Sequence, residues 1–239
     1  MREDGWLSER FGHPVYSLTG LEGGFDAEAL RGHTTGRDAA SYQAKVAAGA
    51  WALVRDLVAA GFREVCTAVT LARALEPPLD PRRDEPVVRP IDPDRDSGLP
   101  DLAARAFHSS RFHLDPYIPG SVATAIKRDW TASYLSGTRG VGALVAEGDH
   151  GPLGFLGMLG TGDVRVIDLI AVDPAGQGRG AGRALVRRLL DETCGHSERV
   201  EVGTQTANGR AIRFYERLGF ATARTAHDLH LHTGTPRWG

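Results

Sequence analysis

The stretch Val164–Leu190, VRVIDLIAVDPAGQGRGAGRALVRRLL, organises the second half of this 239-residue chain. An apolar run typical of a strand ends at Asp173-Pro174, a glycine-rich turn follows, and an amphipathic helix begins at Ala181. Glycines leave the N–H groups of the turn uncovered, and the start of the helix adds unsatisfied N–H groups and a positive dipole end. The stretch therefore predicts a binding site for a pyrophosphate.

Two other phosphate-binding motifs match this stretch less well. A P-loop requires a lysine that is absent here. The segment Gly176–Ala181, GQGRGA, is close to the dinucleotide-binding pattern GxGxxG/A. However, it lies deep in the chain and after a predicted β-meander, whereas that pattern opens a parallel βαβ unit.

Around this stretch the sequence predicts an alternation of helices and strands. Beyond residue 100 we expect helices over 101–107, 122–135, 181–194 and 208–218, a loop over 109–120, and strands over 141–147, 152–159, 164–172, 199–204 and 222–232. Before residue 76 we expect a helix over 38–60, a β-rich stretch over 62–71 and short strand-like pieces around Trp6 and over 14–18.

A segment rich in Pro, Asp and Arg, Glu76–Pro100, separates the two parts. Proline removes backbone donors and restricts its preceding residue, so the segment is typical of a linker, with a short strand over 86–90 left open. We therefore expect two domains, 1–84 and 85–239. A pattern of helix, Gly-Phe and strand occurs in both, at 53–71 and 212–231. It is consistent with a partial duplication of the fold, or with the frequent use of glycine between a helix and a strand in α/β chains.

Composition narrows the function classes. The chain has 28 basic and 30 acidic residues, a formal net charge of −2, which argues against nucleic acid as a partner. The longest run without Asp, Glu, Lys or Arg is His150–Gly162, too short to cross a bilayer, and the N-terminus lacks the pattern of a signal peptide. Cys66 and Cys194 form no CxxC pair, and the sequence contains no cluster of His and Asp residues with the spacing of metal ligands. We expect a cytoplasmic protein without a metal site.

Two motifs together resemble the GCN5-related N-acetyltransferases (GNAT). The first is IAVDPAGQGRGAGRALVRRLL, and the second is NGRAIRFYERLGF, about thirty residues later. The resemblance implies an α/β (α+β) fold with a mixed, mostly antiparallel sheet flanked by helices, preceded here by a smaller, partial GNAT-like domain. It implies acetyl-CoA as cosubstrate and direct attack of an amine on the thioester.

The resemblance also assigns roles to residues. Backbone amides of the turn would hold the coenzyme pyrophosphate, in Gln177, Gly178, Arg179, Gly180, Ala181, Gly182 and Arg183. The main chain of Ile170, Ala171 and Val172 would pair with the pantetheine arm. Asn208 would contact that arm, and Tyr215 would protonate the departing thiolate. Asn208 and Tyr215 are seven residues apart, so they share one helix face.

The general base is less clearly marked. Asp168 lies on the same strand face as Val166 and Ile170 by alternation, and a lone carboxylate there requires explanation because its burial is costly. Family members often carry an acid or histidine on this face, so Asp168 is the predicted base. The alternatives are a partnered or edge-exposed structural Asp, with a water chain taking the proton. Histidines 108, 113, 227, 230 and 232 are predicted to be structural or acceptor contacts.

A bacterial subgroup of the family, the TDP-fucosamine acetyltransferases, resembles the whole chain. The resemblance rests on Phe11-Gly12 and on SYQAKVAAG, ARAFHSSRFHLDPYIPG and VEVGTQTANGRAIRFYERLGF. It implies a dTDP-linked amino sugar as acceptor, an acceptor pocket containing Arg111, Phe112, Asp115 and Tyr117, and a homodimer. The intact VDPAGQGRGAG loop and the Pro-rich linker depart from that subgroup and leave the exact sugar open.

Other functions stay open. The acceptor could be an aminoglycoside, another small amine or a protein N-terminus, or the chain could bind coenzyme A as a sensor without turnover. A polycationic acceptor would need an acidic pocket, whereas the predicted acceptor loop carries Arg111 and His113 beside the single Asp115. This charge pattern favours a neutral or anionic acceptor.

Overall fold

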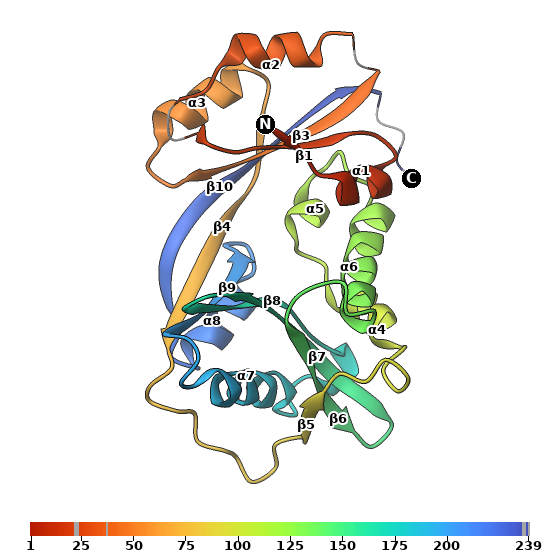
Figure 1. Ribbon diagram of the computed structural model, residues 1–239, viewed down its shortest axis with the longest axis vertical. Helices are drawn as coiled ribbons and strands as arrows, with labels where there is room; N and C mark the ends of the chain where they lie inside the picture. Colours follow the sequence, from red (N-terminus) through yellow and green to blue (C-terminus); the bar gives the residue numbers. More distant parts are fainter. Residues whose placement is uncertain (22–23, 37, 236–237, 239) are drawn as a thin grey trace.

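The computed structural model of the chain, shown in Figure 1, describes residues 1–21, 24–36, 38–235 and 238. Its strands form one ten-stranded sheet in the order β1-β2-β3-β10-β4-β9-β8-β7-β6-β5. Neighbouring strands are antiparallel except for β2 with β3 and β8 with β9. The strands are β1 (Arg2–Glu3), β2 (Val15–Leu18), β3 (Ala39–Ala47), β4 (Arg63–Ala74), β5 (Val88–Pro90), β6 (Gly142–Gly148), β7 (Gly151–Thr161), β8 (Val164–Val172), β9 (Arg199–Gln205) and β10 (Ala221–Gly234).

Helices cover both faces of this sheet, which confirms the predicted fold class. They are α1 (Gly5–Phe11), α2 (Ala27–Thr34), α3 (Trp51–Ala59), α4 (Leu99–Ala106), α5 (Arg111–Leu114), α6 (Gly120–Leu135), α7 (Ala181–Thr193) and α8 (Gly209–Glu216). Beyond residue 100 every predicted helix and strand is present, with ends that differ from the prediction by at most two residues. The predicted loop over 109–120 contains the short helix α5.

The helix predicted over 38–60 is wrong. The structure has strand β3 over its first half, a turn, and the helix α3 over its second half. Residues of β3 alternate between the two sides of the sheet, with Tyr42 and Val46 buried in one core. Residues 41–46, SYQAKV, alternate between polar and apolar side chains, a period of two that favours a strand, and pairing with β2 and β10 fixes it.

The strand-like piece predicted around Trp6 is also wrong, because Trp6 lies in helix α1. The Asp4 side chain accepts a hydrogen bond from the Leu7 amide (3.0 Å) and caps the first turn. Gly12, at φ 70°, ends the helix in the left-handed conformation that glycine adopts at low cost. Local capping therefore decides this element, whereas the piece at 14–18 is strand β2 as predicted.

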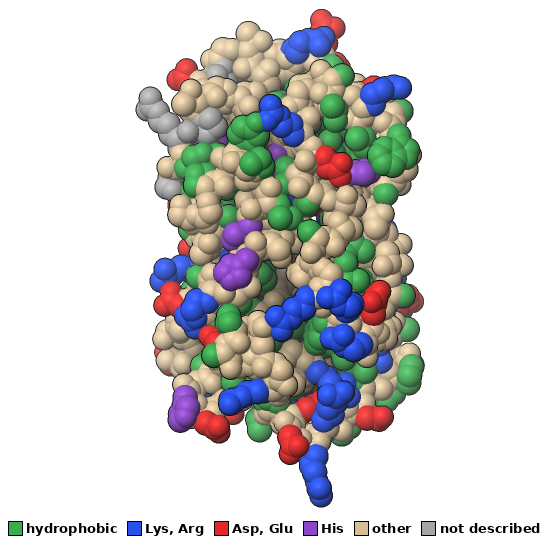
Figure 2. All heavy atoms as spheres, turned by 180° about the vertical axis from the view of Figure 1, so that it is seen from behind, with side chains coloured by type: hydrophobic (Ala, Val, Ile, Leu, Met, Phe, Trp, Pro, Cys, Tyr) green, Lys and Arg blue, Asp and Glu red, His purple; other side chains and the backbone are tan. Residues whose placement is uncertain are grey.

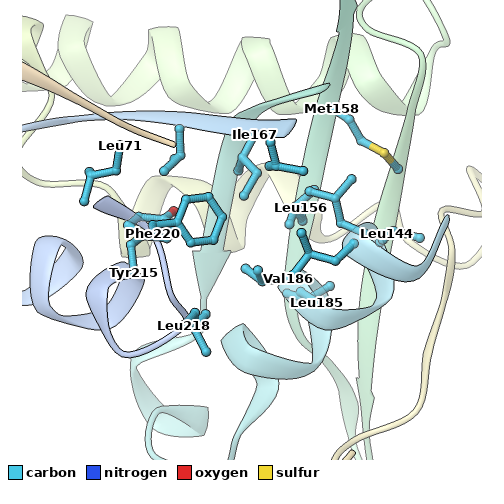
Figure 3. Close-up of a cluster of buried hydrophobic side chains, with 14 of the residues drawn as sticks. Leu71, Leu144, Leu156, Met158, Ile167, Leu185, Val186, Tyr215, Leu218 and Phe220 are labelled. Carbon is cyan, nitrogen blue, oxygen red and sulfur yellow. The ribbon is translucent and has the colours of Figure 1, made fainter. Parts of the chain in front are cut away.

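The lower half of the molecule in Figure 1 has three layers. On one side of the sheet, α7 and α8 pack on residues such as Leu144, Leu156 and Ile167, and Figure 3 shows Tyr215, Leu218 and Phe220 in the same core. On the other side, α4 and α6 cover Val145, Phe155, Leu169 and their neighbours. Neighbours in one strand thus face opposite cores, as strand geometry requires.

Two long strands, β4 and β10, connect the upper and lower halves (Figure 1). Strand β4 comes from the first half of the chain but pairs with β9, while β10 pairs with β3. The units β3–α3–β4 and β9–α8–β10 therefore exchange their last strands, and these two strands pair with each other. The sheet is continuous across residue 85, so the two domains 1–84 and 85–239 stay a prediction.

Candidate active site

The site begins where strands β8 and β9 separate. Their parallel pairing ends at Ile167 and Val202, while β8 continues to Val172 paired only with β7 on its other edge. The edge of Leu169–Val172 that faces away from β7 therefore presents main-chain N–H and C=O groups without a strand partner. An extended amide-containing ligand can hydrogen-bond there as an additional strand would.

The turn after β8 forms the second part of the site. Asp173 accepts a hydrogen bond from the Ala175 amide (2.9 Å), which fixes the start of the turn. Gly178 and Gly180 have φ of 85° and 81°, and no side chain caps the first turn of α7. The N–H groups at this helix start therefore remain available to an anion.

The third part is helix α8, which lies close to the start of α7. A Cβ atom at Gly182 would lie 3.2 Å from the Phe214 ring, so the glycine permits this approach. Asn208 caps α8, and its Oδ1 accepts a hydrogen bond from the Ala211 amide (3.2 Å). Two turns later, Tyr215 is only 2% exposed and its ring contacts those of Phe214 and Phe220.

Burial raises the pKa of Tyr215, because the charged phenolate would lose its hydration. Among the residues that the structure describes, none donates a hydrogen bond to the Tyr215 hydroxyl or accepts one from it. The side chain therefore holds its proton at physiological pH and has a free hydroxyl to offer a reacting group. This is the state that a proton donor requires.

One cavity of about 770 Å³, the central cavity, brings these parts together. It is lined by the following residues predicted to bind the coenzyme or act in catalysis: Ile170, Ala171, Val172, Gln177, Gly178, Gly180, Ala181, Gly182, Arg183, Asn208 and Tyr215. Arg179 instead lines a smaller hollow of about 480 Å³, together with Arg105 and Asp173. Most of the residues predicted to bind the coenzyme or act in catalysis thus lie around one cavity, and their roles stay predictions.

Two further segments line the central cavity and were not predicted to do so. The first is the turn after α4, with Phe107, His108 and Ser109, which precedes the predicted acceptor residues by a few positions. The second is Pro78–Arg82 of the Pro-rich segment. Its composition indicated a linker, and no sequence signal placed it against the coenzyme turn.

Asp168, the predicted base, does not line the central cavity. Arg139 donates two hydrogen bonds to its carboxylate, at 2.6 Å to Oδ2 and 2.9 Å to Oδ1, and the Tyr134 hydroxyl donates a third at 2.9 Å. Burial raises the pKa of Tyr134, and the nearby Asp168 carboxylate raises it further. The structure thus gives Asp168 structural partners, and its role as base stays a prediction.

The four predicted acceptor residues lie outside the lining of the central cavity, and their role stays a prediction. Phe112 is fully buried beside Phe11, and Arg111 lies over the Phe112 ring. Tyr117 is 47% exposed with the Arg63 guanidinium 4.9 Å from its ring centre. Asp115 is buried next to strand β10.

Asp115, His230 and His232 form a compact buried cluster. Asp115 Oδ2 lies 2.6 Å from His230 Nδ1 and 2.8 Å from His232 Nε2. Burial opposes ionisation of Asp115, but the two histidine hydrogen bonds outweigh it and lower the pKa of the carboxyl to about 2. The donor atoms lie within 4.8 Å of one another, so they could hold a metal ion, yet each contact already has the length of a hydrogen bond.

The glycine turn gives a prediction that separates coenzyme binding from stability. Alanine at Gly180 must adopt a positive φ, which costs about 1–2 kcal/mol. Because the turn amides must keep this geometry to hold a pyrophosphate, we expect Gly180→Ala to weaken coenzyme A binding about tenfold, or about 1.4 kcal/mol. Isothermal titration calorimetry measures the change.

Gly195 provides the matched control. It has φ of 80° beyond the other end of α7, and a Cβ there meets nothing within 4 Å. Gly195→Ala carries the same kind of backbone strain as Gly180→Ala, so the two variants should lower the melting temperature by similar amounts. Gly195→Ala should leave coenzyme A binding unchanged. Equal binding losses in both variants would contradict the prediction, because they would reflect general destabilisation.

Comparison with known proteins agrees with this geometry. Residues 139–222 match the family model "Acetyltransferase (GNAT) domain". A solved GCN5-related N-acetyltransferase from Sphaerobacter thermophilus has a similar fold, with a TM-score of 0.59 and 19% identity, over 87% of this chain and 66% of that one. Residues 139–222 are thus similar to the GNAT acetyltransferase domain, a superfamily whose cosubstrate is acetyl-CoA, and the solved structure shows that the fold is shared.

Two curated relatives extend the comparison. The spore coat polysaccharide biosynthesis protein SpsD of Bacillus subtilis is 32% identical over 146 residues, covering 61% of this chain and 50% of that protein. The mycothiol acetyltransferase of Kineococcus radiotolerans is 38% identical over 82 residues, covering 34% and 27%. The chain spans half or less of the length of these relatives. In the part that the structure describes, no helix is both long and apolar enough to cross a membrane.

Proposed function

We propose that the protein is an acetyl-CoA-dependent N-acetyltransferase that acetylates the amine of a nucleotide-linked amino-deoxysugar. The observation that carries the reaction type is that the free edge of β8, the glycine turn and the buried Tyr215 meet in one cavity. A strand edge holds an extended arm, the turn holds a pyrophosphate and the tyrosine supplies a proton. These are the three functions needed to bind acetyl-CoA and to release its thiol.

The sugar is the finer part of the proposal. It is supported by the similarity to a protein of spore coat polysaccharide biosynthesis and by the sequence resemblance to TDP-fucosamine acetyltransferases. A lysine lies next to the cavity, with the Lys127 Nζ 5.0 Å from the ring centre of Phe107, which lines the cavity. Burial, together with the nearby Arg111, lowers the pKa of Lys127 to about 7, so this amine is a cation that favours an anionic acceptor mainly below neutral pH.

For the base, the geometry favours His108 over Asp168. His108 lines the central cavity, and its Nε2 lies 2.7 Å from the Arg105 carbonyl oxygen. A carbonyl oxygen only accepts, so Nε2 must carry the proton and Nδ1 is left as an acceptor. Histidine is well suited to take a proton from an amine near neutral pH. We therefore propose that His108 receives the amine proton, directly or through water.

In this proposal each group has one task. Main-chain N–H groups along the open edge of β8 polarise the thioester carbonyl as the amine attacks. His108 accepts the amine proton, and Tyr215 Oη–H donates a proton to the thiolate that leaves. Acetyl transfer thus needs no covalent intermediate on the protein. The acceptor enters from the side of the turn after α4, opposite the glycine turn of α7.

The test is thiol release from acetyl-CoA with a panel of dTDP-4-amino and dTDP-3-amino sugars, aminoglycosides, polyamines and an N-terminal peptide. We expect turnover with one nucleotide sugar and little with the cationic amines. Turnover with an aminoglycoside or the peptide alone would overturn the acceptor class but keep the enzyme. Coenzyme A binding without turnover of any amine would favour a sensor. The expected homodimer and cytoplasmic location stay predictions.

A further inference from the structure

We propose that the segment Leu75–Glu85, called the strap here, is the outer wall of the coenzyme site, and that its Arg82 acts with Arg210 and Arg217 to bind the 3′-phosphate of coenzyme A. This inference rests on the proposed use of acetyl-CoA. It assigns the Pro-rich segment, which joins the first part of the chain to the second, a direct part in binding the coenzyme.

The start of the strap is held by a buried guanidinium. Arg73, at the end of β4, is only 7% exposed. Its side chain donates hydrogen bonds to the carbonyl oxygens of Ala74 (3.3 Å), Leu75 (3.4 Å) and Pro77. Leu75 and Leu79 also pack against the core beneath α7 and α8. The first part of the strap therefore has a fixed path over these helices.

The end of the strap is held by the coenzyme helix itself. The Glu85 carboxylate is 5% exposed and forms ion pairs with Arg183 (3.2 Å) and Arg187 (2.8 Å) on α7. Arg183 also donates a hydrogen bond to the Asp80 carbonyl oxygen. Arg183 lies in the first turn of α7, directly after the glycine turn, so the strap is joined to the start of this helix. Pro78, Leu79, Asp80 and Arg82 consequently line the central cavity.

The charges that line the central cavity are unbalanced. Four arginines, Arg82, Arg183, Arg210 and Arg217, face a single carboxylate, that of Asp80. Arg183 is neutralised by Glu85. The guanidinium groups of the other three have no ion-pair partner among the described residues. Figure 2 shows Lys and Arg side chains gathered in the lower half of the molecule on the face opposite that of Figure 1.

Coenzyme A carries two anionic groups that these features must satisfy, a pyrophosphate and a 3′-phosphate. The main-chain amides of the glycine turn suit the pyrophosphate, because they lie at the start of α7. The remaining phosphate is a dianion that needs guanidinium donors. Arg82 on the strap and Arg210 and Arg217 on and after α8 are exposed side chains that line the same cavity, so their guanidinium groups are available to this phosphate.

The test compares binding of coenzyme A and of 3′-dephospho-coenzyme A by calorimetry, without any acceptor. We expect the wild type to prefer coenzyme A, and Arg82→Gln to weaken coenzyme A binding about threefold to fivefold, the scale of an exposed ion pair. The same variant should leave binding of the dephospho form unchanged. Arg83→Gln is the matched control, since Arg83 is the exposed neighbour outside the cavity lining, and it should change neither affinity.

Three results would overturn the inference. The wild type could bind coenzyme A and its 3′-dephospho form with the same affinity, Arg82→Gln could lose affinity for both ligands equally, or Arg83→Gln could lose as much affinity for coenzyme A as Arg82→Gln does. An equal loss of both ligands would mean that Arg82 only shapes the strap, and an equal loss in Arg83→Gln would mean that net charge alone acts. A wrong acceptor assignment would leave all these affinities unchanged. Absence of any coenzyme A binding would overturn this inference and the proposed function together.

Discussion

Replacing Tyr215 by phenylalanine should lower kcat about 100-fold while the affinity for acetyl-CoA stays the same. The change removes one hydroxyl from a ring that is 2% exposed, so the packing against Phe214 and Phe220 is kept. A positioned proton donor contributes about 10²–10⁴-fold to a rate. Loss in kcat without loss of coenzyme binding is the signature of an interaction that acts only during the reaction.

The pH dependence gives an independent check on this role. A proton donor works while it is protonated, and burial raises the pKa of Tyr215 above the ordinary value of about 10. Below about pH 10, loss of the Tyr215 proton should therefore cause no fall in the wild-type kcat. Any fall in kcat in this range should be present in Tyr215→Phe as well. Steady-state kinetics with thiol detection measure both effects, and Phe220→Leu controls for packing in the same core. A kcat within twofold of wild type in Tyr215→Phe would reject the donor role.

The coenzyme side of the site was predictable because its signals are local. Strand β8 and the start of α7 have the predicted ends, since alternation, glycines at positive φ and a helix start are all encoded within thirty residues. The roles expected of Asn208 and Tyr215 came from the family resemblance, and helix spacing placed the two on one face. No long-range information was needed to place these residues on one wall of a cavity.

The first half was harder because distant partners determine its structure. Strand β3 alternates over 41–46 but its many alanines also favour a helix, and pairing with β2 and with β10, almost 190 residues later, decides for the strand. The exchange of β4 and β10 between the two β–α–β units could not be seen in the sequence, although the repeat at 53–71 and 212–231 pointed to their similarity. This similarity supports a partial GNAT-like first domain, which remains a proposal.

The acceptor side shows that a motif alone does not tell which of its side chains face a cavity. The segment ARAFHSSRFHLDPYIPG was singled out, but its first part, not its second, lines the central cavity. Phe112 turns into the core, and Asp115 turns to His230 and His232. The direction of a side chain in such a segment depends on what packs against it, and the partners here come from α1 and α6 for Phe112 and from β10 for Asp115.

The Asp168→Asn variant should separate a base from a structural carboxylate. The Asp168 and Arg139 side chains are 15% and 28% exposed, so loss of the charge leaves a largely buried guanidinium without its counter-ion. Breaking such a pair costs about 3 kcal/mol, which should lower the melting temperature by about 6–12 °C. Tyr134, whose hydroxyl donates to the same carboxylate, would lose part of its fixed position under β8.

A double-mutant cycle with Arg139→Gln tests this reasoning. If the carboxylate serves the ion pair, removing both charges should restore part of the stability lost in Asp168→Asn alone, because the unpaired cation is gone. The kcat of Asp168→Asn at a temperature where it is folded should then stay within about fivefold of wild type, since His108 takes the proton. The opposite pattern, an unchanged melting temperature with kcat reduced about 100-fold and rising with pH, would return the role of base to Asp168 and would leave His108 as an acceptor contact.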